Sequence, residues 1–422
     1  MTGLPKAASL AFAFAISGSS VFVLIYGSLG LNGYGAFTAA YLSLTLILMM
    51  VFGSFGDFRL SALDVPLLVL IACAGVSFAK NPVHADLREL ILMALTASAY
   101  FAGRSLSKED LSVLRTTSFL VMAVIVCVGT IVTFPYLVSE SLRGALGRPF
   151  VLGFDSATTA FSLSLGIFVV ALLSSENRSP WIRNASIAVI AISTAVFAAS
   201  MVRFSLLAIM ACTALSLLSK RRRRFALSVL GILVVSTVLG LIVRSNNANL
   251  YLRYTLEETR GDDKFSSAGI LPPSHAASRN PKATTPSCEN VNTRNSIAIR
   301  KQLMTDALDL IPRAGLFGFG FMSFGKLGCF EGMSPHNDVA QVLVEFGWIG
   351  GITFCLLIIL IPLFLVKPAR SDDDMLFLFL LSALMIMLSM VYGQLGRDLP
   401  LFLVLGLAVS ALSRNGCVQL KP

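Results

Sequence analysis

The fold is decided by residues 204–243, which read FSLLAIMACTALSLLSKRRRRFALSVLGILVVSTVLGLIV. Two apolar runs flank consecutive cations at residues 220–224, and each run approaches the roughly 20 residues that a helix needs to cross a hydrocarbon core. Lysine and arginine in short loops stay on the cytoplasmic side of a membrane. The basic run therefore predicts a cytoplasmic turn between two membrane helices, and no nucleic-acid partner is expected.

Most of the rest of the chain is also apolar. Of its 422 residues, 55% are hydrophobic and only 13% are charged, whereas about a quarter of a soluble domain is charged. Apolar runs of similar length predict an all-α polytopic membrane protein with about twelve transmembrane helices. The expected spans are residues 8–29, 34–55, 62–79, 88–103, 112–136, 156–175, 183–200, 203–219, 225–243, 339–366, 375–393 and 398–413.

The orientation follows from counting outward from the basic run. The positive-inside rule then also places Arg104, Arg183 and Lys367 on the cytoplasmic side. Both termini become cytoplasmic, and a long loop lies outside, in the periplasm of a cell that has one. The expected parts are residues 1–243 with nine membrane helices, residues 244–338 as a periplasmic loop with an amphipathic helix and the active-site residues, and residues 339–422 with three helices and a cytoplasmic tail.

Residues 295–311 of the outer loop are typical of an amphipathic helix. At 100° per residue one face holds Ile297, Met304, Leu308 and Ile311, and the opposite face holds Gln302, Asp306 and Asp309. Arg300 falls in the middle of the apolar face. A cation there either snorkels to the lipid interface or points into an anionic site, and the sequence leaves both interpretations open.

Two further residues lie where the chain meets the outer edge of the membrane. Arg203 opens a helix whose inner end is set by the basic run, so it lies roughly 25 Å above Ser219. An arginine at that depth is costly unless paired; a phosphate is its natural partner, and snorkelling to lipid headgroups is the alternative. His336 lies where the outer loop re-enters the membrane, and imidazole suits proton transfer near neutral pH. A helix-capping or interfacial histidine is the alternative.

The remaining features of the loop are its glycines and cysteines. Residues 315–324 read GLFGFGFMSF, which favours a packing or re-entry device over a backbone cradle for phosphate. Cys288 and Cys329 lie in the loop, and an oxidising compartment predicts a disulfide between them. The loop has no cluster of histidines and carboxylates with metal-ligand spacing, so no metal and no cofactor are expected.

These motifs resemble the signature of the bacterial O-antigen ligase and O-antigen polymerase superfamily. The resemblance rests on Arg300, the Gly318-Phe319-Gly320 turn, the run Pro335-His336-Asn337, and Gly347-Trp348-Ile349-Gly350. The ligase pattern of histidine, asparagine or serine, nine residues, and Gly-x-x-Gly is met in full. The match covers about residues 290–366, with weaker likeness around residues 148–166 and Arg203. The topology also agrees, since the superfamily has a GT-C-like fold with a large periplasmic loop before the last three helices.

The resemblance implies a metal-independent glycosyltransferase of the bacterial inner membrane whose active site faces the periplasm. It would transfer an oligo- or polysaccharide from undecaprenyl diphosphate to an acceptor hydroxyl. His336 would then be the general base, and Arg203 and Arg300 would bind the diphosphate, with Arg294 competing for the role of the loop arginine. The candidate supporting residues are Asn337, Glu331 and Asp338. Surface solvation is the expected role of the two carboxylates, and orientation of the imidazole is the alternative.

The acceptor decides between related activities. Lipid A core would make the protein a ligase, the next lipid-linked repeat would make it an O-antigen or exopolysaccharide polymerase, and a protein hydroxyl is a third option. The complete histidine pattern favours the ligase. From another class, a polysaccharide transporter or flippase would show paired repeats and polar residues at mid-membrane, and neither is evident here. A structural membrane subunit would leave the loop without a purpose, so membrane lipids are the only further partners expected.

Overall fold

The computed structural model describes residues 4–30, 36–53, 60–80, 87–106, 110–138, 149–154, 156–175, 179–244 and 296–414. Its helices are α1 (Leu4–Ser28), α2 (Ala36–Phe52), α3 (Val65–Lys80), α4 (Leu87–Arg104), α5 (Asp110–Val138), α6 (Ala157–Leu173), α7 (Pro180–Ala199), α8 (Phe204–Leu215), α9 (Arg223–Val243), α11 (Ser296–Leu310), α12 (Phe324–Leu327), α13 (Asp338–Glu345), α14 (Gly347–Val366), α15 (Asp373–Tyr392) and α16 (Leu399–Arg414). The predicted all-helical class is confirmed for these residues.

Apolar helices dominate the described chain. Seven helices, namely α1, α3, α5, α7, α9, α14 and α15, are long and apolar enough to cross a membrane. Shorter apolar helices are α2, α4, α6, α8 and α16. Together they coincide with the expected spans, which is the pattern of a polytopic membrane protein. The number of twelve spans stays a prediction.

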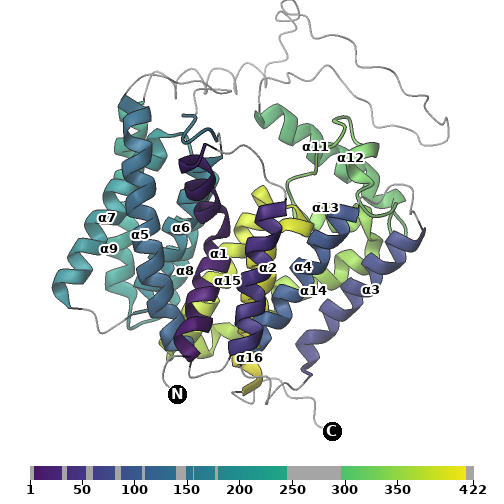
Figure 1. Ribbon diagram of the computed structural model, residues 1–422, viewed down its shortest axis with the longest axis horizontal. Coiled ribbons are helices and arrows are strands. Elements are labelled where there is room, and N and C mark those ends of the chain that lie inside the picture. The colour runs from purple at the N-terminus through teal and green to yellow at the C-terminus, as the bar shows by residue number, and fades with distance from the viewer. Residues whose placement is uncertain are drawn as a thin grey trace, which may run out of the picture.

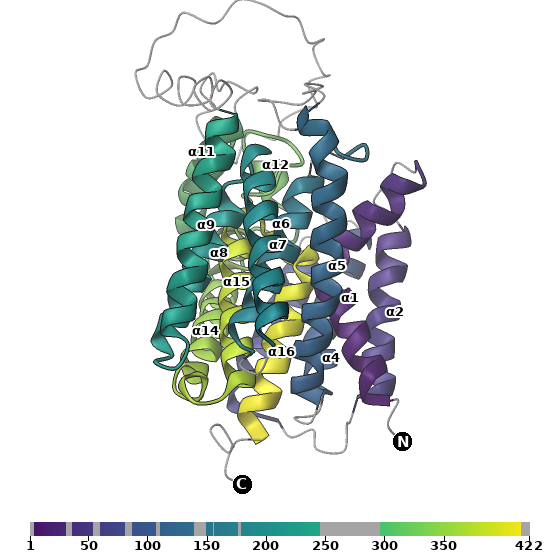
Figure 2. The same ribbon diagram turned by 90° about the vertical axis from the view of Figure 1, so that its left-hand side faces the viewer.

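The two ends of the helix bundle differ (Figures 1 and 2). Helix α1 begins and α16 ends at one end, which also holds the connection between α8 and α9 with the cations at residues 220–224. We call this the basic end. Helices α11 and α12 lie at the opposite end, which we call the loop end (Figure 1). This arrangement agrees with the predicted grouping of termini and basic run on one side of the membrane.

Two ion pairs, one buried and one partly buried, join helices at the basic end. Asp64 accepts hydrogen bonds from the Arg104 guanidinium at 3.1 Å and the Tyr100 hydroxyl at 2.7 Å. Arg222, within the basic run, pairs with Asp373 at the start of α15 at 2.6 Å. Charged pairs out of water persist when each charge has a partner. The basic run therefore also anchors α8 and α9 to α15.

Glycines let α4 and α16 pack backbone against backbone. A Cβ atom on Gly103 would collide with the carbonyl oxygen of Leu403, and one on Gly406 with that of Tyr100. Small residues allow such close approach between helices in an apolar environment. Helix α16 is buried along most of its length and lies inside the bundle.

The expected span over residues 339–366 is interrupted. Helix α13 ends at Glu345, and α14 begins at Gly347, whose φ is +73°. The glycine segment crosses at this break, because the Phe319 amide donates to the Val344 carbonyl at 3.0 Å and the Trp348 amide donates to the Gly315 carbonyl at 3.0 Å. The packing interpretation of the glycine segment is thus confirmed, and a side chain at Gly347 would collide with that segment.

Candidate active site

Helix α11 packs on α12 and α13 at the loop end (Figure 1). A small hydrophobic cluster, separate from the main core, joins these elements; its buried members are Leu303, Ala307, Leu310, Phe324, Ala340 and Val344. Because α13 begins directly after His336 and Asn337, this cluster ties the helix that carries Arg300 to the turn that carries the histidine.

The apolar and polar faces assigned to α11 from its helical periodicity are each wrong at one residue. Leu308 is 60% exposed, whereas Asp306 is fully buried. The Asp306 carboxylate accepts a hydrogen bond from the Cys329 amide at 2.8 Å and another from the Gln302 side chain at 2.7 Å. Such bonds offset the cost of burying a carboxylate. Periodicity alone cannot foresee a turn, distant in the sequence, that supplies a donor.

Arg300 lies against two aromatic rings from the membrane helices. Its guanidinium carbon is 5.5 Å from the ring centre of Phe204, the first residue of α8, and 5.4 Å from that of Tyr392, the last residue of α15. Cations at such distances are attracted by the ring quadrupole. Arg300 thus lies against the ends of α8 and α15, and its place in an anionic site stays a prediction.

Arg203 precedes α8 and is half-buried. Helix α7 ends just before it in a Schellman motif, in which the Val202 amide donates to the Phe197 carbonyl at 3.2 Å and the Met201 amide to the Ala198 carbonyl at 2.9 Å. Met201 has a left-handed φ of +61°. Arg203 follows this tight turn directly. It is the chain neighbour of Phe204, the residue that contacts Arg300. Arg294 lies outside the described residues.

His336 occupies a strained turn before α13. Its φ of +53° is left-handed, which is uncommon for a residue other than glycine and costs on the order of 1 to 3 kcal/mol. Asn337 stabilises the turn as the N-cap of α13, where its side-chain oxygen accepts from the Ala340 amide at 3.0 Å. The side-chain nitrogen of Asn337 donates to the Met390 carbonyl near the end of α15 at 3.1 Å. Asn337 therefore supports the histidine through the backbone.

The surroundings of His336 favour the neutral imidazole. The side chain is half-buried, and this burial lowers its pKa below the ordinary value of 6.5. The nearby positive charge of Arg300 lowers the pKa further. A neutral imidazole at neutral pH can accept a proton, which is what a general base requires. The contacts agree with the proximity of Arg300, because it lies against the Tyr392 ring and Asn337 bonds to the Met390 carbonyl, so that Arg300 and the turn of His336 both lie against the end of α15.

The two candidate carboxylates near His336 have different environments. Glu331 is exposed, as expected of a solvated group. Asp338 is fully buried, so the prediction of surface solvation is wrong for it. Its carboxyl group interacts with that of Asp398, in the turn between α15 and α16. The pair links the start of α13 to that turn.

Burial and the neighbouring carboxylate raise the pKa of Asp338 well above its ordinary value. Burial also raises the pKa of Asp398, to about 6. Both folded-state pKa values thus exceed the ordinary 3.8. The stability that protonation of the pair contributes is complete below the ordinary pKa of 3.8 and is lost as pH rises through the raised folded-state pKa values of the pair.

We expect Asp338→Asn to flatten the dependence of the thermal midpoint on pH. Asparagine keeps a donor for Asp398 and does not titrate, so less stability should be lost between about pH 5 and pH 8. Thermal unfolding of the purified protein across this range measures the effect. Asp309→Asn, an exposed site on α11, is the matched control. Equal slopes for wild type and Asp338→Asn would contradict the raised pKa of Asp338.

The predicted disulfide is only partly within the described residues. Cys329 is disulfide-bonded, whereas Cys288 lies outside the described residues. We expect non-reducing peptide mapping to recover the two cysteines in one linked fragment. The crosslink would close a loop of about 40 residues and contribute about 3 to 4 kcal/mol by the chain-entropy model. Recovery of Cys288 as a free thiol would refute the pairing.

Sequence reasoning missed Phe204, Tyr392 and Asp398. Asp398 offered one signal, because it is a carboxylate at the end of a membrane helix that the topology places outside. The two aromatic residues offered none, since aromatic side chains are common at membrane interfaces.

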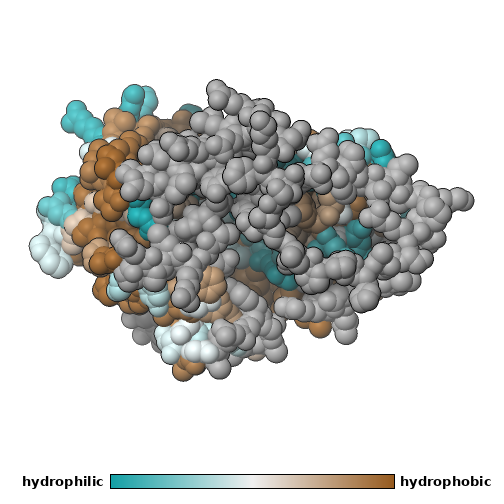
Figure 3. All heavy atoms as spheres, turned by 90° about the horizontal axis from the view of Figure 1, so that it is seen from above, coloured by the Kyte–Doolittle hydropathy of each residue, from teal (hydrophilic) through white to brown (hydrophobic). Residues whose placement is uncertain are grey.

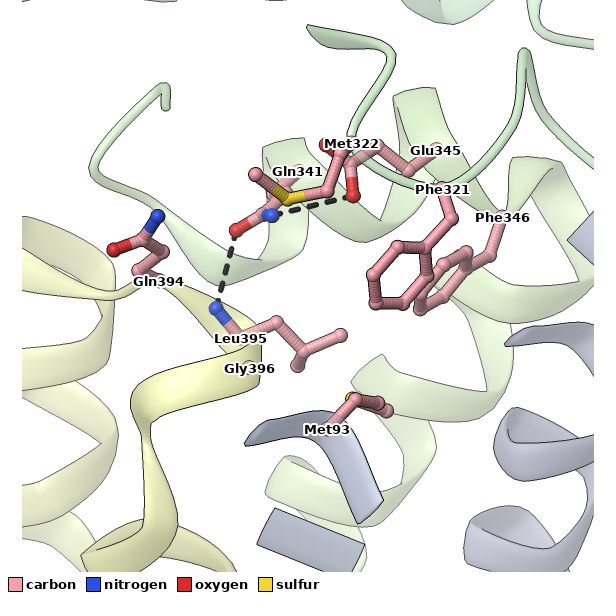
Figure 4. Close-up of a pocket in the computed structure, with 9 residues that line it drawn as sticks. All are labelled: Met93, Phe321, Met322, Gln341, Glu345, Phe346, Gln394, Leu395 and Gly396. Carbon is pink, nitrogen blue, oxygen red and sulfur yellow. Dashed lines mark hydrogen bonds between the residues drawn. The ribbon is translucent and has the colours of Figure 1, made fainter. Parts of the chain in front are cut away.

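A small cavity lies beside α13 (Figure 4). Its volume of about 10 Å³ holds about one water molecule. Gln341 bridges it, donating to Glu345 at 3.2 Å and accepting from the Leu395 amide at 3.1 Å. The residues that line this cavity do not include His336, Arg203 or Arg300. Gln341 therefore ties α13 to the turn before α16. The cavity itself is too small for a sugar.

The loop end is mixed in polarity. Seen from above, hydrophilic side chains are visible in the middle of this face, and apolar side chains cover much of its rim on one side (Figure 3). Among the residues that the structure describes, no group of three or more histidine, cysteine or acidic side chains is placed to hold a metal ion.

Comparison with known protein families matches residues 187–355 to the O-antigen ligase family. This range runs from within α7 into α14 and contains Arg203, Arg300 and His336. No curated protein and no solved structure matched the chain. Residues 187–355 thus match the O-antigen ligase family, which confirms the resemblance to the O-antigen ligase and polymerase superfamily.

Proposed function

We propose that this protein is a multi-pass glycosyltransferase of the bacterial inner membrane. It transfers an oligo- or polysaccharide from undecaprenyl diphosphate to an acceptor hydroxyl on the periplasmic face. The observation that supports this most is the proximity of His336 and Arg300 at the loop end, inside the range that matches the O-antigen ligase family. A base and a cation are what the displacement of a diphosphate from a sugar requires.

In the proposed reaction the acceptor oxygen attacks the anomeric carbon of the donor glycan. The hydroxyl proton passes to the neutral imidazole of His336 as the new carbon–oxygen bond forms. The bond between the anomeric carbon and the diphosphate oxygen breaks, and its electron pair leaves with undecaprenyl diphosphate. Arg203 and Arg300 stabilise the negative charge that develops on the leaving group, since guanidinium groups bind phosphate oxygens in pairs. No step needs a metal ion.

The acceptor we favour is lipid A core, which makes the protein an O-antigen ligase of lipopolysaccharide synthesis. The full match to the ligase pattern from His336 to Gly350 supports this choice. A repeat-unit polymerase is the alternative within the same domain family. The basic end would face the cytoplasm and the loop end the periplasm, by the positive-inside rule.

Deletion of the gene in its native cell tests the proposed acceptor. A ligase deletion leaves long glycan on the lipid carrier, and this is the result we expect. Single repeats attached to lipid A core would instead identify a polymerase and overturn the ligase assignment. Unchanged glycan on both lipids would contradict the transferase proposal as a whole.

A further inference from the structure

The contacts of Arg300 indicate how this cation, which lies on the apolar face of α11, is held in place. Arg300 is on α11, at the loop end, while Phe204 and Tyr392 belong to the two membrane helices α8 and α15. These two helices pack against each other. The guanidinium group thus meets one ring from each member of a packed helix pair, at 5.5 Å and 5.4 Å.

Aromatic rings are chemically suited to position a cation that binds an anion. A ring attracts the guanidinium through its quadrupole and carries no net charge. A carboxylate at the same distance would offset the positive charge and compete with an anionic ligand. A ring contact therefore positions a guanidinium group without adding a negative charge.

The position of Phe204 adds a second consequence. It follows Arg203 directly, so the ring that contacts Arg300 belongs to the turn that presents the other candidate arginine. Consecutive Cα atoms are about 3.8 Å apart, so the contact between Phe204 and Arg300 also keeps the backbone of Arg203 near Arg300. The charge of Arg300 also acts on His336, just before α13.

We propose that Phe204 and Tyr392 form an aromatic clamp that positions Arg300, so that α8, α11 and α15 together present one cationic site for a diphosphate. The inference rests on the proposed function and extends it, because it makes Phe204 and Tyr392 positioning residues that act through Arg300. Neither residue has a part in proton transfer.

A double-mutant cycle tests the clamp with purified full-length protein and undecaprenyl diphosphate as the probe. Tyr392→Leu removes the ring and is expected to weaken binding by about 2-fold to 30-fold, the range that cation–π contacts span. Tyr392→Phe keeps the ring and should bind like wild type. In the Arg300→Ala background, Tyr392→Leu should cause no further loss, because the cation it acts on is gone. Phe204→Leu repeats the cycle if Tyr392→Leu does not fold.

The same cycle is measured on the thermal midpoint, which needs no ligand. Coupling between Arg300 and Tyr392 in both readouts supports the clamp and its role. Full additivity in the thermal midpoint, or a loss of binding that is equally large in the Arg300→Ala background, overturns the clamp. Failure of the proposed function has a different signature, since wild type would then neither bind undecaprenyl diphosphate nor transfer glycan while the thermal coupling persists.

Discussion

His336→Ala is expected to abolish glycan transfer while the protein stays folded and inserted. The acceptor hydroxyl loses its proton only during the reaction, so removal of the base affects turnover and leaves donor binding intact. Loss of a general base costs about 100-fold to 10,000-fold in rate. The measurement is the rate of transfer from lipid-linked glycan to acceptor by purified variants in detergent.

The left-handed backbone at His336 calls for a second variant. His336→Asn removes the imidazole but places there a residue that tolerates this conformation. It should be as inactive as His336→Ala and at least as stable. Met333→Ala, an exposed residue of the same loop, should transfer glycan at the wild-type rate. Wild-type activity of either His336 variant would remove this residue from the mechanism.

Replacing Arg203 or Arg300 should impair the protein in a different way from replacing His336. Arg203→Ala and Arg300→Ala are expected to weaken binding of undecaprenyl diphosphate and to slow turnover, because each removes a charge-assisted contact to the donor. Such contacts contribute about 1.5 to 3 kcal/mol, which is about 10-fold to 150-fold in affinity. Arg203→Lys and Arg300→Lys should keep only part of the donor affinity, since lysine supplies the charge but cannot bind two phosphate oxygens at once. Donor affinity and transfer rate are measured side by side.

Arg313→Ala is the control for general loss of positive charge, because Arg313 is an exposed arginine just after α11. It should bind the donor like wild type. A further readout separates Arg300 from Arg203: Arg300→Ala removes a charge that lowers the pKa of His336, so the acid limb of the pH profile should move to higher pH. Unchanged donor affinity in both arginine variants would refute their assignment to the diphosphate.

Features with a local cause could be predicted from the sequence. The lengths of α8 and α9 and the turn between them follow from apolar run length and from the cations at residues 220–224. Helix α11 was likewise expected, because residues 295–311 have helical periodicity. His336 and Asn337 stood out because they precede an apolar run. These arguments need only neighbours in the sequence.

Features that depend on distant partners could not be predicted. The break between α13 and α14 exists because the glycine segment bonds across it. The burial of Asp306 depends on the amide of Cys329, and that of Asp338 on Asp398. Tyr392 becomes relevant only when α11 lies over the end of α15. Helical periodicity and hydropathy contain no information on such pairs.

The central claim is that His336 and the two arginines transfer a glycan from undecaprenyl diphosphate to a hydroxyl group. The most direct measurement incubates the purified protein with labelled undecaprenyl diphosphate-linked glycan and lipid A core in the presence of a metal chelator. We predict that labelled glycan appears on lipid A core, that undecaprenyl diphosphate is released in equal amount, and that His336→Ala forms neither product. Absence of both products with wild-type protein, or their loss in chelator alone, would contradict the account.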